Sequence, residues 1–81
     1  MTRAEFSAEL QALGAKIREK RSVAGLSQEG LADACGLDRT YVGGVERGER
    51  NLGFVNLLRI AKALEVDPSD LLTGIRAGSG E

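Results

Sequence analysis

Histidine and tryptophan are missing from this 81-residue sequence, and cysteine and proline each occur only once. Without histidine, neither a Cys/His metal site nor a Ser–His or Cys–His catalytic pair can form. Cys35 has no second cysteine with which to form an internal disulfide. The glycines also lack the spacing and the lysine of a phosphate-binding loop. We therefore expect no catalytic residue, metal site or cofactor, and an enzyme is the function that the sequence favours least.

Long apolar runs are lacking as well. No segment approaches the roughly 20 apolar residues that span a membrane. Near the N-terminus, Glu5 and Glu9 lie where a secretion signal would be apolar. We expect a single cytoplasmic domain without membrane contact. Because so short a chain buries only about 60–65% of its unfolded surface, association with a second copy would help to stabilise it.

Apolar residues recur at helical spacing along the chain, and no segment alternates as a strand does. Ser27, Asp38 and the Asp67–Pro68 pair are typical helix starts, whereas Gly25 and Gly36 are typical helix ends. The sequence predicts an all-α domain over residues 1–74 and a short flexible tail over 75–81. The five expected helices cover residues 7–23 (or from Thr2), 28–35, 39–47, 54–64 and 68–72.

The second and third expected helices are separated by a short turn around Gly36 and Leu37, which is helix-turn-helix spacing. Leu37, Val42 and Val45 would then pack inward. The outward positions of the third helix would be Arg39, Thr40, Gly43, Gly44 and Arg47. Any small helical bundle with a solvated face would give the same pattern, so the spacing alone leaves both interpretations open.

The segment LSQEGLADACGLDRTYVGGVERGERN, followed by LLRIAKALEVDPSDLL, resembles the Cro/phage-repressor helix-turn-helix family over about residues 9–74. Within it, LDRTYVGGVERGERN is most similar to the controller proteins of restriction–modification systems. The resemblance implies a five-helix, repressor-like domain that regulates transcription by binding double-stranded DNA in the major groove. It also implies a homodimer on an inverted-repeat operator, with RNA polymerase as a candidate further partner. An antitoxin that neutralises a toxin, or a phage-type repressor, remains the alternative.

The resemblance also implies roles for individual residues. Those expected to contact bases are Arg39, Thr40, Tyr41 and Arg50. Those expected to hold the phosphate backbone are Gln28, Arg47 and Asn51. Glu46 matches a family position that pairs with an arginine at the end of the first helix, here Arg21, and such a pair would brace the third helix.

Gly43 and Gly44 are unusual within a helix, where each costs about 0.5–1 kcal/mol relative to alanine. One hypothesis is that their missing side chains let the helix backbone approach DNA closely. The other, for Gly44, is that it avoids a clash with a neighbouring helix. Gly43 also departs from the family pattern, which has serine at this position.

The net charge of −1 is not that of a typical DNA-binding domain. Basic residues are nevertheless concentrated locally, since residues 39–51 hold three arginines against two glutamates. Apolar residues are in surplus near the C-terminal end, and such a cluster often marks an interface. The residues of the fourth helix expected in the core are Phe54, Leu57, Ala61 and Leu64. The expected dimer interface consists of Val55, Leu58, Val66, Leu71, Leu72 and Ile75.

Overall fold

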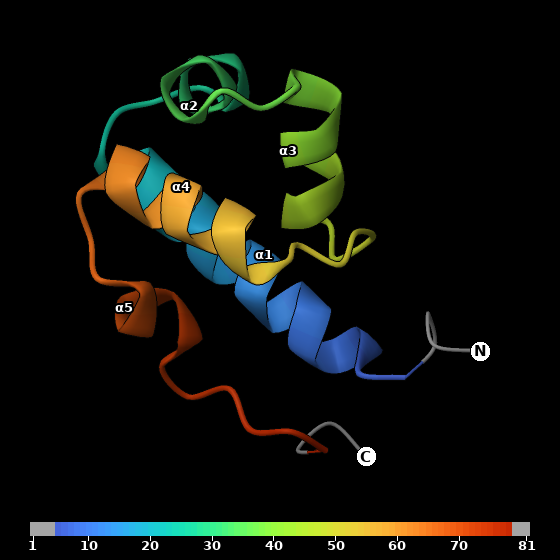
Figure 1. The fold of residues 1–81 in the computed structure, drawn as a ribbon. Helices are drawn as coiled ribbons and strands as arrows, with labels where there is room; N and C mark the ends of the chain where they lie inside the picture. The colour runs from blue at the N-terminus through green and yellow to red at the C-terminus, as the bar shows by residue number, and fades with distance from the viewer. Residues whose placement is uncertain (1–4, 79–81) are drawn as a thin grey trace.

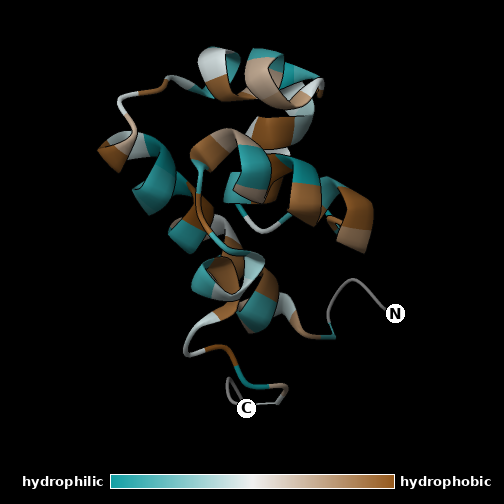
Figure 2. Ribbon diagram, turned by 60° about the vertical axis from the view of Figure 1, so that its left-hand side comes forward, coloured by the Kyte–Doolittle hydropathy of each residue, from teal (hydrophilic) through white to brown (hydrophobic). Residues whose placement is uncertain are grey.

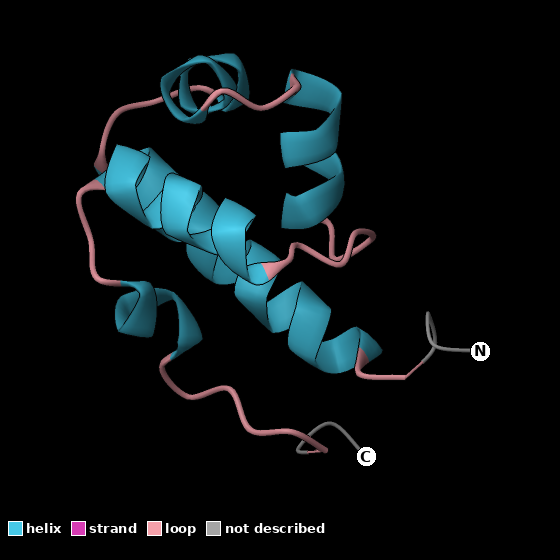
Figure 3. Cartoon of the chain, viewed as in Figure 1, coloured by secondary structure: helices cyan, strands magenta, loops and turns pink. Residues whose placement is uncertain are grey.

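The computed structural model describes residues 5–78, which form five helices and contain no strand (Figures 1 and 3). The helices are α1 (Ser7–Val23), α2 (Gln28–Cys35), α3 (Arg39–Glu46), α4 (Phe54–Leu64) and α5 (Pro68–Leu72). The all-α prediction is confirmed, and the expected bounds agree to within a residue for α2 to α5. Of the two expected starts of α1, Thr2 lies outside the described residues, and within them the helix starts at Ser7.

Side-chain caps define the ends of the two helices of the helix-turn-helix. The Ser27 hydroxyl accepts a hydrogen bond of 2.9 Å from the Gly30 N–H at the start of α2. The Asp38 carboxylate accepts one of 2.7 Å from the Thr40 N–H at the start of α3. Between them, Gly36 adopts φ 73°, a left-handed conformation that ends α2 and that glycine adopts without strain. These local signals fix the turn that separates α2 from α3.

The core lies where the apolar sides of all five helices meet, and Figure 2 shows hydrophobic and hydrophilic residues alternating along the helices. α3 packs on α1 and α2, α4 packs on α2, and α5 packs against α1 and α4 (Figure 1). The completely buried side chains include Ile17, Leu31, Val42, Ile60 and Leu71. Cys35 is also buried, and burial raises the pKa of its thiol.

Two expectations about apolar residues are wrong. Phe54 is 70% exposed rather than part of the core, because it is the first residue of α4 and the buried face of that helix begins at Leu57. Ile60 belongs to that face and was not predicted. Leu71 was expected in a dimer interface but has no exposed surface, because the short α5 covers the core with this side chain.

The segment after α5 returns toward α1. The Gly78 N–H donates a hydrogen bond of 2.8 Å to the Glu9 carboxylate, which joins the end of the described chain to the first turn of α1. The boundary expected at residue 74 stays a prediction. None of the helices within residues 5–78 has the length and apolar character needed to cross a membrane.

Candidate nucleic-acid interface

Two glycines allow α3 and the loop after it to lie directly on α1. A Cβ atom on Gly14, in the middle of α1, would overlap the carbonyl oxygens of Val45 and Glu46. A Cβ atom on Gly48 would lie 2.6 Å from Cγ and 2.8 Å from Cα of Gln11. Gly48 also has φ 78°, a conformation that other residues adopt only with strain. The orientation of α3 therefore depends on backbone contact between the two helices.

An ion pair also joins α1 to α3, near the C-terminal end of each helix. The Arg21 guanidinium donates two hydrogen bonds to the Glu46 carboxylate, of 2.7 and 3.0 Å, and a third of 2.9 Å to the Leu26 carbonyl oxygen. The Gln28 side-chain amide donates a further bond of 3.0 Å to Glu46. The expected pair is thus present, and it connects α1, α2 and α3.

The electrostatics of Glu46 follow from this network. Burial disfavours the charged carboxylate, but the hydrogen bonds from Arg21 and Gln28 outweigh it, so the pKa of Glu46 lies below its usual value of 4.5. The pKa of Arg21 is raised by the hydrogen bonds to Glu46. Both side chains are therefore charged at neutral pH, and the pair is almost completely buried, with 13% of Arg21 and 3% of Glu46 exposed.

The residues expected to contact bases belong to the first turn of α3 and to the loop after it. Arg39 and Thr40 are the first two residues of α3 and are exposed, as are Arg50 and Asn51 in the loop to α4. The N-terminal turn of the second helix of a helix-turn-helix is the part that enters the major groove. Arg39 and Thr40 lie on this turn and Arg50 is exposed in the loop after α3, and their base contacts stay predictions.

Tyr41 is less accessible than the other expected base contacts. Its hydroxyl donates a hydrogen bond of 3.2 Å to the Leu52 carbonyl oxygen and accepts one of 3.4 Å from the Asn56 amide. The ring packs partly against the core, and the guanidinium carbon of Arg50 lies 5.9 Å from the ring centroid. The Tyr41 ring therefore supports the loop and is close to Arg50.

Two of the residues expected to hold phosphates already have partners within the chain. Arg47 donates two hydrogen bonds, of 3.0 and 3.1 Å, to the Glu49 carboxylate, and this raises the pKa of Arg47. Gln28 uses one of its amide hydrogens on Glu46. Their phosphate contacts stay predictions, and for Arg47 a phosphate would have to compete with Glu49.

Gly43 and Gly44 were expected to face outward on α3, but both are buried in the structure, under polar side chains. A Cβ atom on Gly43 would lie 3.2 Å from Arg47 Nη1 and 3.4 Å from Gln28 Oε1. The three atoms nearest to a Cβ on Gly44 all belong to Arg50, and the closest is Cγ at 3.0 Å. The alternative, a clash of Gly44 with a neighbouring helix, is therefore also wrong.

Gly14, Gly48 and Asn56 contribute to the site but were not identified from the sequence. Gly14 could have been found, because it lies on the apolar face of α1 at helical spacing from Leu10 and Ile17, where a missing side chain indicates a close helix contact. Asn56 gives no such signal. Its bond to Tyr41 depends on how the loop between α3 and α4 folds.

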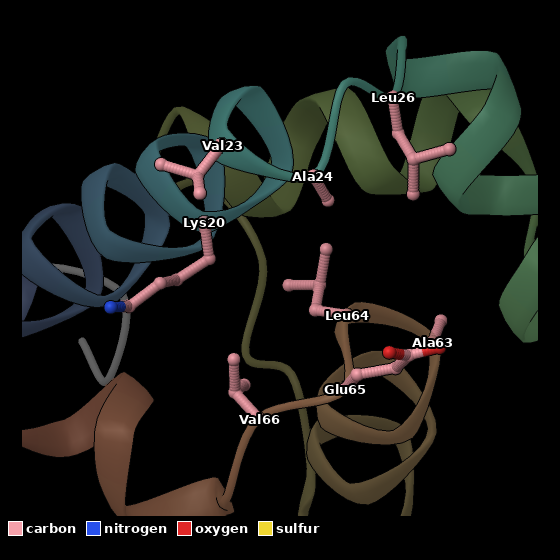
Figure 4. Close-up of a pocket in the computed structure, with 8 residues that line it drawn as sticks. All are labelled: Lys20, Val23, Ala24, Leu26, Ala63, Leu64, Glu65 and Val66. Atoms are coloured by element: carbon pink, nitrogen blue, oxygen red, sulfur yellow. The ribbon is translucent and has the colours of Figure 1, made fainter.

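A cavity of about 520 Å³ lies elsewhere, between the C-terminal ends of α1 and α4. Figure 4 shows Leu26 and Leu64 extending into it from opposite sides, with Lys20 and Glu65 at its border. None of its lining residues belongs to α3 or to the loop after it, so the cavity is separate from the candidate interface.

The geometry agrees with the comparison to known proteins. The sequence pattern of the helix-turn-helix family matches residues 17–71, which include all of α2, α3 and α4. The chain belongs to the helix-turn-helix family. The resemblance noted in the sequence is thus confirmed, and the matched segment contains every residue expected to contact DNA.

Within the helix-turn-helix family, the similar proteins include controllers of restriction–modification. Control protein C.BamHI from Bacillus amyloliquefaciens is 46% identical over 69 residues, which cover 84% of this chain and 85% of that protein. Control protein C.SmaI from Serratia marcescens is 48% identical over 61 residues, or 75% and 73% of the two chains. The crystal structure of the controller protein C.AhdI from Aeromonas hydrophila is 55% identical, with a TM-score of 0.78 over 79% of this chain and 97% of that one. These relatives favour the transcription regulator over the antitoxin.

Proposed function

We propose that this chain is the controller protein of a restriction–modification system, a cytoplasmic transcription regulator that binds an inverted-repeat operator as a homodimer. The observation that carries the proposal is the exposure of Arg39 and Thr40 in the first turn of α3, and of Arg50 in the loop after it, in a chain similar to controller proteins along most of its length. RNA polymerase is the further partner that such a regulator would contact.

Arginine suits the reading of bases because its guanidinium donates two parallel hydrogen bonds to O6 and N7 of guanine. Arg39 and Arg50 are the exposed arginines of this face without a carboxylate partner within hydrogen-bonding distance among the described residues, whereas Arg47 is paired with Glu49. We assign direct base contacts to Arg39 and Arg50 and a further one to Thr40. Tyr41 would contribute through the edge of its ring.

Phosphate contacts would come from Gln28, Asn51 and Arg47. Such contacts position the protein without reading sequence, and they make the affinity depend on salt. Because Glu49 partly neutralises Arg47 and the chain is weakly acidic overall, we expect the affinity for random DNA to be modest. Selectivity then depends on the base contacts.

The apolar surface of α4 and α5 supports the homodimer. Val55 and Leu58 on α4 and Leu72 on α5 remain exposed, and Val66 and Ile75 beside them are half-buried. A two-fold interface there would place two copies of α3 about 34 Å apart, one turn of DNA. One protomer makes too few base contacts to select a site in a genome, whereas two linked half-sites provide enough.

Selection from a random DNA library tests this function directly. Purified protein should enrich an inverted repeat whose half-sites lie about 10 base pairs apart, and the same repeat should occur upstream of its own gene. Enrichment of a single half-site would contradict the dimer. Recovery of no preferred sequence would contradict the function as a whole.

A further inference from the structure

We propose that Gly44 is a positioning residue for Arg50: the missing side chain leaves a slot on α3 in which the aliphatic part of Arg50 lies. This inference rests on the proposed function, because it concerns how one of the proposed base-reading residues is held. It differs from a direct approach of the helix backbone to DNA, since the space above Gly44 is filled by the protein itself.

The backbone brings Arg50 over α3. After α3 the chain reverses at Gly48, whose N–H donates to the Val45 carbonyl oxygen at 3.0 Å. The next N–H, that of Glu49, donates to the Gly44 carbonyl oxygen at 2.8 Å. Residue 50 therefore begins directly beside Gly44, whatever its side chain.

The side chain of Arg50 then follows the surface that Gly44 leaves free. A Cβ atom at position 44 would lie 3.0 Å from Cγ of Arg50, 3.5 Å from Nε and 3.8 Å from Cδ. Even alanine would be tighter against Cγ than nine in ten real Cβ contacts, and Cγ is close to the backbone rather than at the flexible end. Alanine at position 44 would therefore force Cγ of Arg50, and with it the rest of the side chain, to shift by a few tenths of an ångström.

The Tyr41 ring restricts the position of the guanidinium group of Arg50. The guanidinium carbon lies 5.9 Å from the centroid of the Tyr41 ring, within the range of a cation–π interaction. The ring is itself held by the hydrogen bonds of its hydroxyl to Leu52 and Asn56. Arginine otherwise loses much rotamer freedom when it binds, so restraint at both ends lowers the entropy cost of its base contact.

The consequence is that the two glycines of α3 have different roles. The three atoms nearest to a Cβ on Gly44 all belong to Arg50, whereas Gly43 lies under Arg47 Nη1 and Gln28 Oε1, which are the far ends of flexible side chains. Gly43→Ala is therefore a matched control, because it adds the same methyl group to the same helix one residue away without touching Arg50.

The first experiment needs no DNA. In the wild-type protein, NMR should show nuclear Overhauser contacts between Gly44 Hα and the Hγ and Hδ atoms of Arg50, together with ring-current shifts from Tyr41. Gly44→Ala should change the ring-current shifts of Arg50, and Gly43→Ala should leave them unchanged. A wild-type Arg50 side chain without contacts to residue 44 would overturn the proposal.

The second experiment measures base preference, as the ratio of the Kd values for the operator and for variants of each base pair. Arg50→Ala identifies the base pair that Arg50 reads by relaxing its preference about five- to 150-fold. At that base pair alone, Gly44→Ala should lower the preference about twofold or more in the wild-type background and not at all in the Arg50→Ala background. A purely structural effect would weaken binding to all sequences alike and leave this ratio unchanged.

An unchanged preference in Gly44→Ala, or an equal loss with and without Arg50, would overturn the positioning role. A wild-type protein with no base preference at all would instead overturn the proposed function, and the NMR measurement would still decide whether the slot holds Arg50. The two failures are therefore distinguishable.

Discussion

Arg21 at the end of α1 and Glu46 at the end of α3 face each other through two hydrogen bonds, of 2.7 and 3.0 Å, in a nearly buried setting. Because α3 carries the proposed base-reading residues, this pair links the stability of the fold to the orientation of the candidate interface. Gln28 adds α2 to the same link through its bond to Glu46.

Removing one partner of this pair should be costly. Arg21→Met leaves the Glu46 carboxylate buried without its cation, and we expect a loss of about 3 kcal/mol in the free energy of unfolding, well above the roughly 0.2–1 kcal/mol of an exposed pair. Urea unfolding of Arg21→Met, Glu46→Gln and the double mutant measures the coupling. A coupling energy indistinguishable from zero would show that the pair does not brace α3.

The same carboxylate makes the stability depend on pH. Because the pKa of Glu46 is lower in the folded protein than its usual value of 4.5, its contribution is complete above that usual value and is lost as the pH falls through the folded value. The difference in unfolding free energy between wild type and Glu46→Gln should therefore be largest near neutral pH and shrink in acid. A constant difference from pH 7 to pH 3 would contradict the lowered pKa.

Base reading should be divided between Arg39 and Arg50. Replacing either with alanine removes a guanidinium that fits guanine, so the preference at one base pair per half-site should fall by about 1–3 kcal/mol. Competition against random DNA measures it. Arg76→Ala removes the same charge from the segment after α5 and should leave all preferences unchanged. If both alanine variants kept the full preference, the assignment of these two residues would be wrong.

Gly14 should tolerate no side chain, although alanine is the better helix former by about 1 kcal/mol. A methyl group there meets backbone carbonyl oxygens of α3, which cannot move as a side chain could, so Gly14→Ala should lower the unfolding free energy by about 1–3 kcal/mol. Thermal unfolding measures it. The control Gly30→Ala meets chiefly the Ser27 and Leu26 side chains, and it should be neutral or slightly stabilising. Equal melting temperatures for the two variants would contradict the close contact of α1 and α3.

The homodimer should depend on Leu58, which is 39% exposed on α4. Leu58→Glu places a charge in the proposed apolar interface, so this variant should sediment as a monomer at micromolar concentrations where the wild type is a dimer. Val23→Glu makes the same kind of change at an exposed apolar residue of α1, outside the proposed interface, and should remain dimeric. A dimeric Leu58→Glu variant would place the interface elsewhere.

Local signals were sufficient to predict the helices. Ser27, Asp38 and Gly36 act through bonds or dihedral angles within a few residues, and the structure has them in the expected roles. Which apolar side chains are buried was harder to predict, because the burial of Phe54 and Leu71 depends on how α4 and α5 pack in the fold rather than on the chemistry of the two side chains.

In the candidate interface, too, some contacts could be predicted from the sequence and others depend on how the chain folds. The Arg21–Glu46 pair was expected because the family resemblance already relates two positions distant in sequence. The cover of Gly44 by Arg50 was not expected, since it depends on the hydrogen bond from Glu49 to Gly44 and on the left-handed Gly48. Those features belong to a folded loop, and periodicity along a helix does not report them.

Because Cys35 is buried, its labelling by a thiol reagent can be used to follow unfolding of this chain. This thiol is the only one in the sequence and it is 9% exposed, and burial raises its pKa, which disfavours the reactive thiolate in the folded protein. A chromogenic disulfide reagent will therefore react with it only when the helices around it separate. The labelling rate of each variant then gives the frequency of that opening without any engineered label, at the same protein concentrations as the DNA-binding measurements.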